Sequence, residues 1–165
     1  LSNRETDILI SLSRPKKGRL KSWKLCDYYV KLYGSNEYLK NNSKISDIKD
    51  LTNHKFVNYA DELIEFPELN YLQEINSNPN VVFSSNSLRS QLLAVKNGIG
   101  IGLLHSFVAY KEKDLKVILP EKINIKREYW IVVHENNFHL RRIKAVTDFV
   151  TTILNDEKKF LSTVE

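Results

Sequence analysis

The stretch NVVFSSNSLRSQLLAVKNGIGIGLL, residues 80–104, decides the fold of this chain. Its β-branched and aromatic start at 81–83 predicts a strand. The small polar residues at 84–87 carry side-chain oxygens that can cap the free N–H groups of a helix start. Apolar residues then recur at the i, i+4 and i+7 spacing of one helix face, and a second apolar run closes the stretch. We therefore predict a short βαβ unit whose helix start can hold a small anion.

Three glycines in this stretch, Gly98, Gly100 and Gly102, look like a dinucleotide-binding fingerprint. However, the third glycine comes one residue early. The glycines also follow a helix and precede a strand, which is the reverse of the order that cradles a pyrophosphate. We therefore interpret them as a helix stop at Gly98, followed by close packing between helix and strand.

The bulk composition is that of an ordinary globular protein. A length of 165 residues fits one domain or two small lobes, and 42% hydrophobic residues are enough to build a core. The net charge of +5 would permit contact with nucleic acid, but acidic residues are interspersed among the basic ones. We interpret the densest basic run, residues 14–19, as a solvated loop, with DNA contact through it as the weaker alternative.

The single cysteine, Cys26, rules out an internal disulfide and favours a reducing compartment. No apolar run approaches the ~20 residues of a membrane span, and no signal-peptide pattern is recognisable. We therefore expect a soluble, cytoplasmic protein with no membrane partner. The chain starts at Leu1 and contains no methionine, so we expect it to be a piece of a longer protein.

Predicted strands alternate with predicted helices, which indicates the α/β class. Two strands, 25–33 and 128–134, are long enough to run from one lobe into another, and they predict a cleft where they cross. The near-continuous apolar character of 128–134 predicts burial on both of its faces. The longest helix is predicted at 140–154. The residues on its apolar face are Ile143, Val146, Phe149 or Val150, and Ile153.

Residues that could carry catalysis or hold a metal are thinly spread. The four histidines show no i, i+4 pair and no HExxH spacing, so we expect no metal site. A nucleophilic serine would need a strained elbow such as GxSxG, which the chain lacks. The serines at 84–87 are therefore interpreted as cap and ligand-binding residues. At His105 a polar contact to a ligand and plain surface exposure are both open. We predict no enzyme activity and no cofactor.

Several segments in the right order resemble the C-terminal effector-binding domain of LysR-type bacterial transcriptional regulators. No single segment is diagnostic, but their order and natural spacing are specific. The segments are TDILI at 6–10, LYGSNEYL at 32–39, SDIKDLTNH at 46–54, LLAVKNGIGIGLL at 92–104, WIVVH at 130–134 and RIKAVTDF at 142–149.

This resemblance implies a two-lobed, type II periplasmic-binding-protein-like α/β fold with a small-molecule inducer in the interlobe cleft. We expect a partial first lobe and crossing strand at 1–31, a second lobe at 32–124, and the returning strand and last helix of the first lobe at 125–165. The family's helix-turn-helix and the start of its first lobe find no counterpart in this sequence, so the first lobe is expected to be incomplete. DNA would be contacted only through that missing domain, and we expect a homodimer or homotetramer in the full-length protein.

The resemblance also implies ligand contacts from the loop after the first strand, from the start of the central helix and from two wall residues. These residues are Ser11, Ser13, Arg14, Tyr59, Ser85, Asn86, Ser87 and His105. Arg14 can pair with a carboxylate through two parallel hydrogen bonds, so we expect a carboxylated metabolite. The leading function is the sensing half of a regulator, and the alternative is a solute-binding protein of the same fold.

Overall fold

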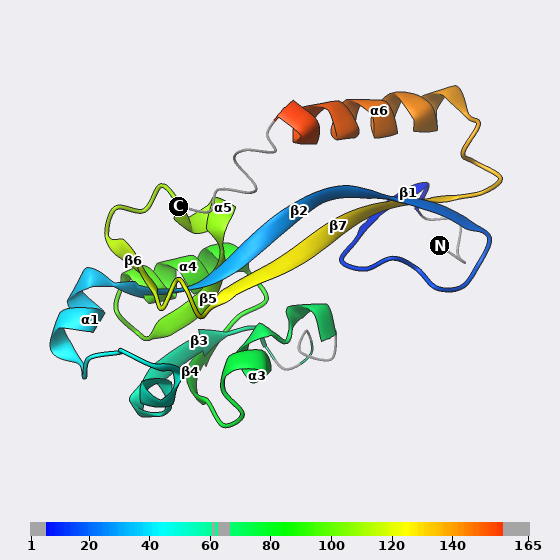
Figure 1. Ribbon diagram of the computed structural model, residues 1–165. Helices are drawn as coiled ribbons and strands as arrows, with labels where there is room; N and C mark the ends of the chain where they lie inside the picture. The colour runs from blue at the N-terminus through cyan, green and yellow to red at the C-terminus, as the bar shows by residue number, and fades with distance from the viewer. Residues whose placement is uncertain (1–5, 61, 63–66, 157–165) are drawn as a thin grey trace. The chain divides into compact units, whose positions relative to one another are not determined.

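The computed structural model of the chain (Figure 1) describes residues 6–60, 62 and 67–156. The chain divides into two compact units. Unit 1 comprises Leu1–Tyr28 and Lys126–Glu165, and unit 2 comprises Tyr29–Ile125. None of the helices in the described part is long and apolar enough to cross a membrane.

Strands and helices alternate along the chain, as the predicted α/β class requires. The strands are β1 (Ile8–Ser11), β2 (Leu20–Ser35), β3 (Lys55–Asn58), β4 (Asn80–Ser84), β5 (Ile101–His105), β6 (Leu115–Ile118) and β7 (Asn124–His134). The α-helices are α1 (Asn36–Asn41), α3 (Tyr71–Ile75), α4 (Leu88–Lys96), α5 (Ser106–Ala109) and α6 (Arg141–Asp156). The 3-10 helices are η1 (Ile48–Asn53) and η2 (Pro67–Leu69).

Unit 2 is built around the βαβ unit predicted at 80–104, which is confirmed. β3 pairs in parallel with both β4 and β5, and α4 connects β4 to β5 (Figure 1). The neighbouring β2 pairs antiparallel with β5 and β6. Leu92 and Val95 on the apolar face of α4 belong to a buried cluster with Tyr33 and Val57 of the sheet. Burial of this helix face against the strands supplies the core of the unit.

The glycines after α4 allow two close approaches. Gly98 has φ +70°, and it ends α4 in the left-handed region where a residue without a Cβ is least strained. A Cβ on Gly100 would lie 2.6 Å from the carbonyl oxygen of Lys55, on the neighbouring β3. A Cβ on Gly102 would lie 2.8 Å from Cγ2 of Val95, on α4. The predicted helix stop and the predicted close packing are therefore both confirmed.

In unit 1, β1 pairs antiparallel with β7, which places Ser11 opposite Trp130. On its other side β7 neighbours β2. Burial on both faces, predicted for 128–134, holds at 131–133. It is wrong for 128–130 and for His134, which are half-buried. The polar atoms of Glu128 and Trp130 bond to each other at 3.1 Å.

The apolar face predicted for α6 is only partly buried. Ile143 is buried and Val150 is half-buried, but Val146, Phe149 and Ile153 are 48%, 65% and 44% exposed. The helix instead turns Thr147 inward. The Thr147 hydroxyl donates a hydrogen bond to the Lys144 carbonyl, one turn back in the helix, at 3.0 Å. Periodicity marked the apolar stripe correctly, but it did not indicate which edge of that stripe is buried.

We predict that alanine at position 100 costs more free energy of unfolding than alanine at position 98. At Gly100 the added methyl group meets backbone atoms, so β3 must shift, and overpacking of this kind costs about 3 kcal/mol. At Gly98 the nearest atom to a Cβ is 3.6 Å away, so only the left-handed backbone is penalised, by about 1 kcal/mol. Urea unfolding of Gly100→Ala and Gly98→Ala measures the difference. Equal losses would contradict the close approach of β3 to residue 100.

Candidate functional site

The loop after β1 is shaped by a serine hydroxyl. Ser11 Oγ donates to the Ser13 carbonyl at 2.8 Å and accepts the Ser13 N–H at 3.4 Å. Such local side-chain bonds favour a turn over continued strand. The turn leads to Arg14, whose guanidinium carbon lies over the ring of Trp130, 5.6 Å from the ring centroid. Arg14 is exposed, and no carboxylate among the described residues forms an ion pair with it.

The polar turn between β4 and α4 is held by its own side chains. The Ser87 hydroxyl accepts the Ser90 N–H at 3.3 Å and so caps α4, as predicted. Ser85 Oγ accepts the Ser87 N–H at 3.1 Å, and the Ser85 carbonyl accepts from Nε2 of the buried Gln91 at 2.7 Å. Asn86 is exposed, and its side chain makes no hydrogen bond to a described residue. The turn is therefore held by contacts within the chain, with the Asn86 amide side chain exposed.

His105 ends β5 inside an aromatic cluster. Its ring centroid lies 6.1 Å from that of Tyr71 and 5.3 Å from that of Phe107, and the Tyr59 ring lies 6.2 Å from Tyr71. The Tyr71 hydroxyl is 3.4 Å from Nε2 of His105. His105 is only 2% exposed, which excludes the surface position that the sequence left open. Burial lowers the pKa of His105 to about 4, so the ring is neutral at neutral pH.

The candidate residues of unit 2 gather at one edge of the sheet. β3, β4 and β5 are parallel, so their carboxyl ends lie at the same edge, where α/β proteins bind ligands. Tyr59 follows β3, Ser85 follows β4 and His105 ends β5. The Ser85 N–H donates to the Asn58 carbonyl at 3.1 Å, which ties two of these strand ends together. The loop 11–14 forms the candidate group of unit 1. Ligand contact by either group stays a prediction, and so does the cleft.

Three residues that support the candidates were not singled out from the sequence. Tyr71 lies between Tyr59 and His105, and Gln91 holds the turn before α4. Trp130 lies under Arg14. Tyr71 and Gln91 carry no motif. The contact of Trp130 depends on the register of β1 with β7, which local sequence does not encode.

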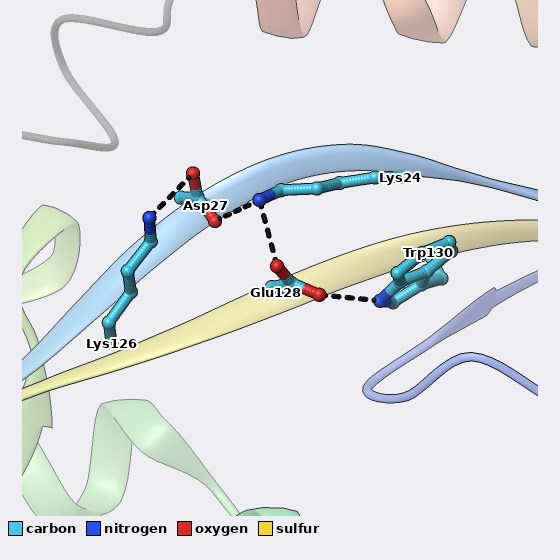
Figure 2. A network of polar contacts seen from close by, with 5 residues as sticks. All are labelled: Lys24, Asp27, Lys126, Glu128 and Trp130. Carbon is cyan, nitrogen blue, oxygen red and sulfur yellow. Dashed lines mark hydrogen bonds and ion pairs between the residues drawn. The ribbon is translucent and has the colours of Figure 1, made fainter.

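A network of polar contacts runs from Trp130 along β7 and β2 within unit 1 (Figure 2). Trp130 Nε1 donates to Glu128 Oε2 at 3.1 Å, and Glu128 Oε1 accepts from Lys24 Nζ at 2.8 Å. Asp27 then pairs with Lys24 at 2.6 Å and with Lys126 at 3.2 Å.

Asp27 and Glu128 raise the pKa of Lys24. At Asp27, partial burial by itself would raise the pKa of the carboxyl group. The hydrogen bonds and charges of Lys24 and Lys126 outweigh that effect, so the pKa is lowered. Partly exposed pairs contribute little stability one by one, so the main effect of the network is to order its side chains.

A hollow of about 700 Å³ in unit 1 contains none of the eight candidate residues. Its lining residues are Trp23, Phe138, His139, Lys144, Thr147, Asp148, Thr151 and Thr152. Over the described ranges, no group of three or more His, Cys, Asp or Glu side chains is placed to hold a metal ion.

An α/β chain in two units, with polar turns at the carboxyl ends of parallel strands, has the architecture of a periplasmic-binding-protein-like effector domain. Residues 1–154 match the LysR substrate binding domain, and the chain belongs to this family. A search of curated proteins gives no match.

Solved regulatory domains share the fold at low sequence identity. The regulatory domain of CrgA, a LysR-type transcriptional regulator from Neisseria meningitidis, aligns with a TM-score of 0.76 and 19% identity over 93% of this chain and 78% of that one. The CcmR regulatory domain of Synechocystis PCC6803, in complex with 2-PG, aligns with a TM-score of 0.72 and 16% identity over 92% of this chain and 75% of that one. Full-length AphB of Vibrio cholerae gives a TM-score of 0.74 and 16% identity over 93% of this chain but 54% of that protein. The predicted type II periplasmic-binding-protein-like α/β fold is therefore confirmed.

We predict that acidification from pH 7 to pH 4.5 lowers the free energy of unfolding, with His105 as a main cause. Unfolded His105 takes up a proton below its ordinary pKa of 6.5, whereas the folded residue does so only near pH 4. The contribution of His105 to the free energy of unfolding is therefore fully present above pH 6.5. It is lost as the pH falls toward 4, and the loss reaches up to about 3 kcal/mol. Urea unfolding at a series of pH values measures the slope.

The variant His105→Gln is expected to flatten this slope while lowering stability at pH 7. Burial also lowers the pKa of His54, so some slope should remain. The exposed His139 supplies the matched control, because His139→Gln makes the same substitution at a position that the core does not bury. An unchanged slope in His105→Gln would show that burial of this ring is not linked to stability.

Proposed function

We propose that this chain is the ligand-sensing domain of a LysR-type DNA-binding transcriptional regulator. The match of residues 1–154 to the LysR substrate binding domain carries the proposal, and it favours a regulator over a solute-binding protein. DNA would be bound by a helix-turn-helix domain upstream of Leu1. The full-length regulator would act in the cytoplasm as a homodimer or homotetramer, and the role of this domain would be to bind a ligand rather than to catalyse a reaction.

We further propose a small carboxylated metabolite as the ligand. The proposed contacts come from Ser11, Ser13, Arg14, Ser85, Asn86 and Ser87, with the buried Tyr59 and His105 as wall residues. Arg14 gives the strongest support, because its guanidinium is exposed and meets no described carboxylate, so its N–H donors remain available to an anion. The start of α4 adds backbone N–H groups, which also favour negative charge. The CcmR regulatory domain in complex with 2-PG is a precedent for a small ligand on this fold.

Carboxylated metabolites are expected to raise the thermal midpoint of the chain, and Arg14→Gln should abolish that effect. A ligand at a hundred times its dissociation constant stabilises the folded state by about 2.7 kcal/mol, which far-UV circular dichroism detects. The assay compares a panel of organic acids with neutral and cationic analogues of the same size.

Arg19→Gln is the matched control for this assay. Arg19 is a strongly exposed arginine of unit 1 that pairs with Glu135 at 3.6 Å, so its loss changes the net charge equally but leaves Arg14 in place. This control should respond to carboxylates as the wild type does. Stabilisation by neutral or cationic compounds but not by any acid would refute the carboxylate. An equal loss of response in both variants would refute the specific role of Arg14.

The regulatory role is tested by the mass of the native product. Immunoprecipitation from the source cells and intact mass spectrometry should find a species well above 19.3 kDa. Its N-terminal part should contain a helix-turn-helix. A native product of 19.3 kDa would contradict the proposal, because the chain would then act without a DNA-binding domain.

A further inference from the structure

Arg14 is held against a side chain that is itself fixed in place. In the antiparallel pair of β1 and β7, Ser11 lies opposite Trp130, so the loop that leaves β1 starts next to this indole. The Ser11–Ser13 turn then brings the guanidinium of Arg14 over the indole ring, 5.6 Å from its centroid. Strand register and a local turn together therefore set the contact between Arg14 and Trp130.

The indole cannot turn freely, because its polar edge is bonded. Trp130 Nε1 donates to Glu128 on the same strand at 3.1 Å (Figure 2). Glu128 is held in turn by Lys24 of β2 at 2.8 Å, and Lys24 by Asp27. The ring under Arg14 is thus anchored to two neighbouring strands of unit 1 through a connected set of polar contacts.

Stacking and anion binding use different parts of an arginine. A guanidinium over an aromatic ring is attracted through its flat face, while its N–H donors lie in its own plane and point outward. Those in-plane donors are the ones that pair with a carboxylate through two parallel bonds. An arginine held in this way loses less side-chain freedom when the anion arrives, and such preorganisation raises affinity.

We propose that Trp130 is a positioning residue for anion binding, which holds Arg14 with its donors directed away from the ring, while Glu128 fixes the orientation of the indole. The inference rests on the proposed function, because it assumes that Arg14 binds the carboxylate. It adds a residue that touches no ligand and acts through Arg14.

The test follows the Nε–Hε resonance of Arg14 by NMR in the full chain, while acetate replaces chloride at constant ionic strength. Acetate is the simplest carboxylate, so the test needs no identified metabolite. In the wild type the resonance should show a ring-current shift that Trp130→Leu removes. Trp130→Leu should also need about two- to tenfold more acetate for half of the response, which is the factor expected when one flexible side chain has to be immobilised on binding.

Two further variants separate positioning from a general effect. Trp130→Phe keeps a smaller ring and should give an intermediate midpoint, and it replaces the leucine variant if that one does not fold. Trp23→Leu removes the other tryptophan of unit 1 and should behave as the wild type does. An acetate midpoint in Trp130→Leu or Trp130→Phe that equals the wild-type midpoint would overturn the positioning role and leave anion binding by Arg14 intact. No response of wild-type Arg14 to acetate would instead overturn the carboxylate contact itself, and this inference with it.

Discussion

Parallel strands cannot be joined by a tight turn, and this constraint governs unit 2. The chain has to cross from the carboxyl end of β4 back to the start of β5, and α4 makes that crossing. The helix must therefore begin at the carboxyl edge of the sheet. The polar turn that precedes it is consequently placed at the edge where β3 and β5 end, and Ser85 bonds to the end of β3. The grouping of Tyr59, Ser85 and His105 follows from strand direction alone, before any side-chain contact is considered.

Close packing supports the same crossing. Gly100 and Gly102 let β5 approach β3 and α4 at distances that a Cβ would prevent. The buried Gln91 joins the helix to the turn before it, so the helix start is tied to its own strand. Unit 1 obtains order by different means. There, partly exposed charged side chains on β2 and β7 bond to each other and to an indole, and these contacts order the surface more than they stabilise the fold.

Local signals were the reliable part of the sequence. The cap at Ser87, the left-handed stop at Gly98 and the apolar face with Leu92 and Val95 are all decided within a few residues, and each was predictable. Contacts between distant segments were not predictable in the same way. Arg14 meets Trp130 only because β1 pairs with β7 in one register, and His105 meets Tyr71 only because separate elements converge. For α6, periodicity located the helix but not its buried edge, because that choice depends on what the helix packs against.

The exposed stripe of Val146, Phe149 and Ile153 on α6 has a practical consequence for anyone who handles this protein. Apolar surface of this kind takes up the amphiphilic dyes that report unfolding in fluorescence-based melting assays. The folded chain would then give a raised starting signal, which narrows the range over which dye fluorescence can rise on unfolding. Label-free optical or calorimetric detection therefore suits this domain better than dye fluorescence.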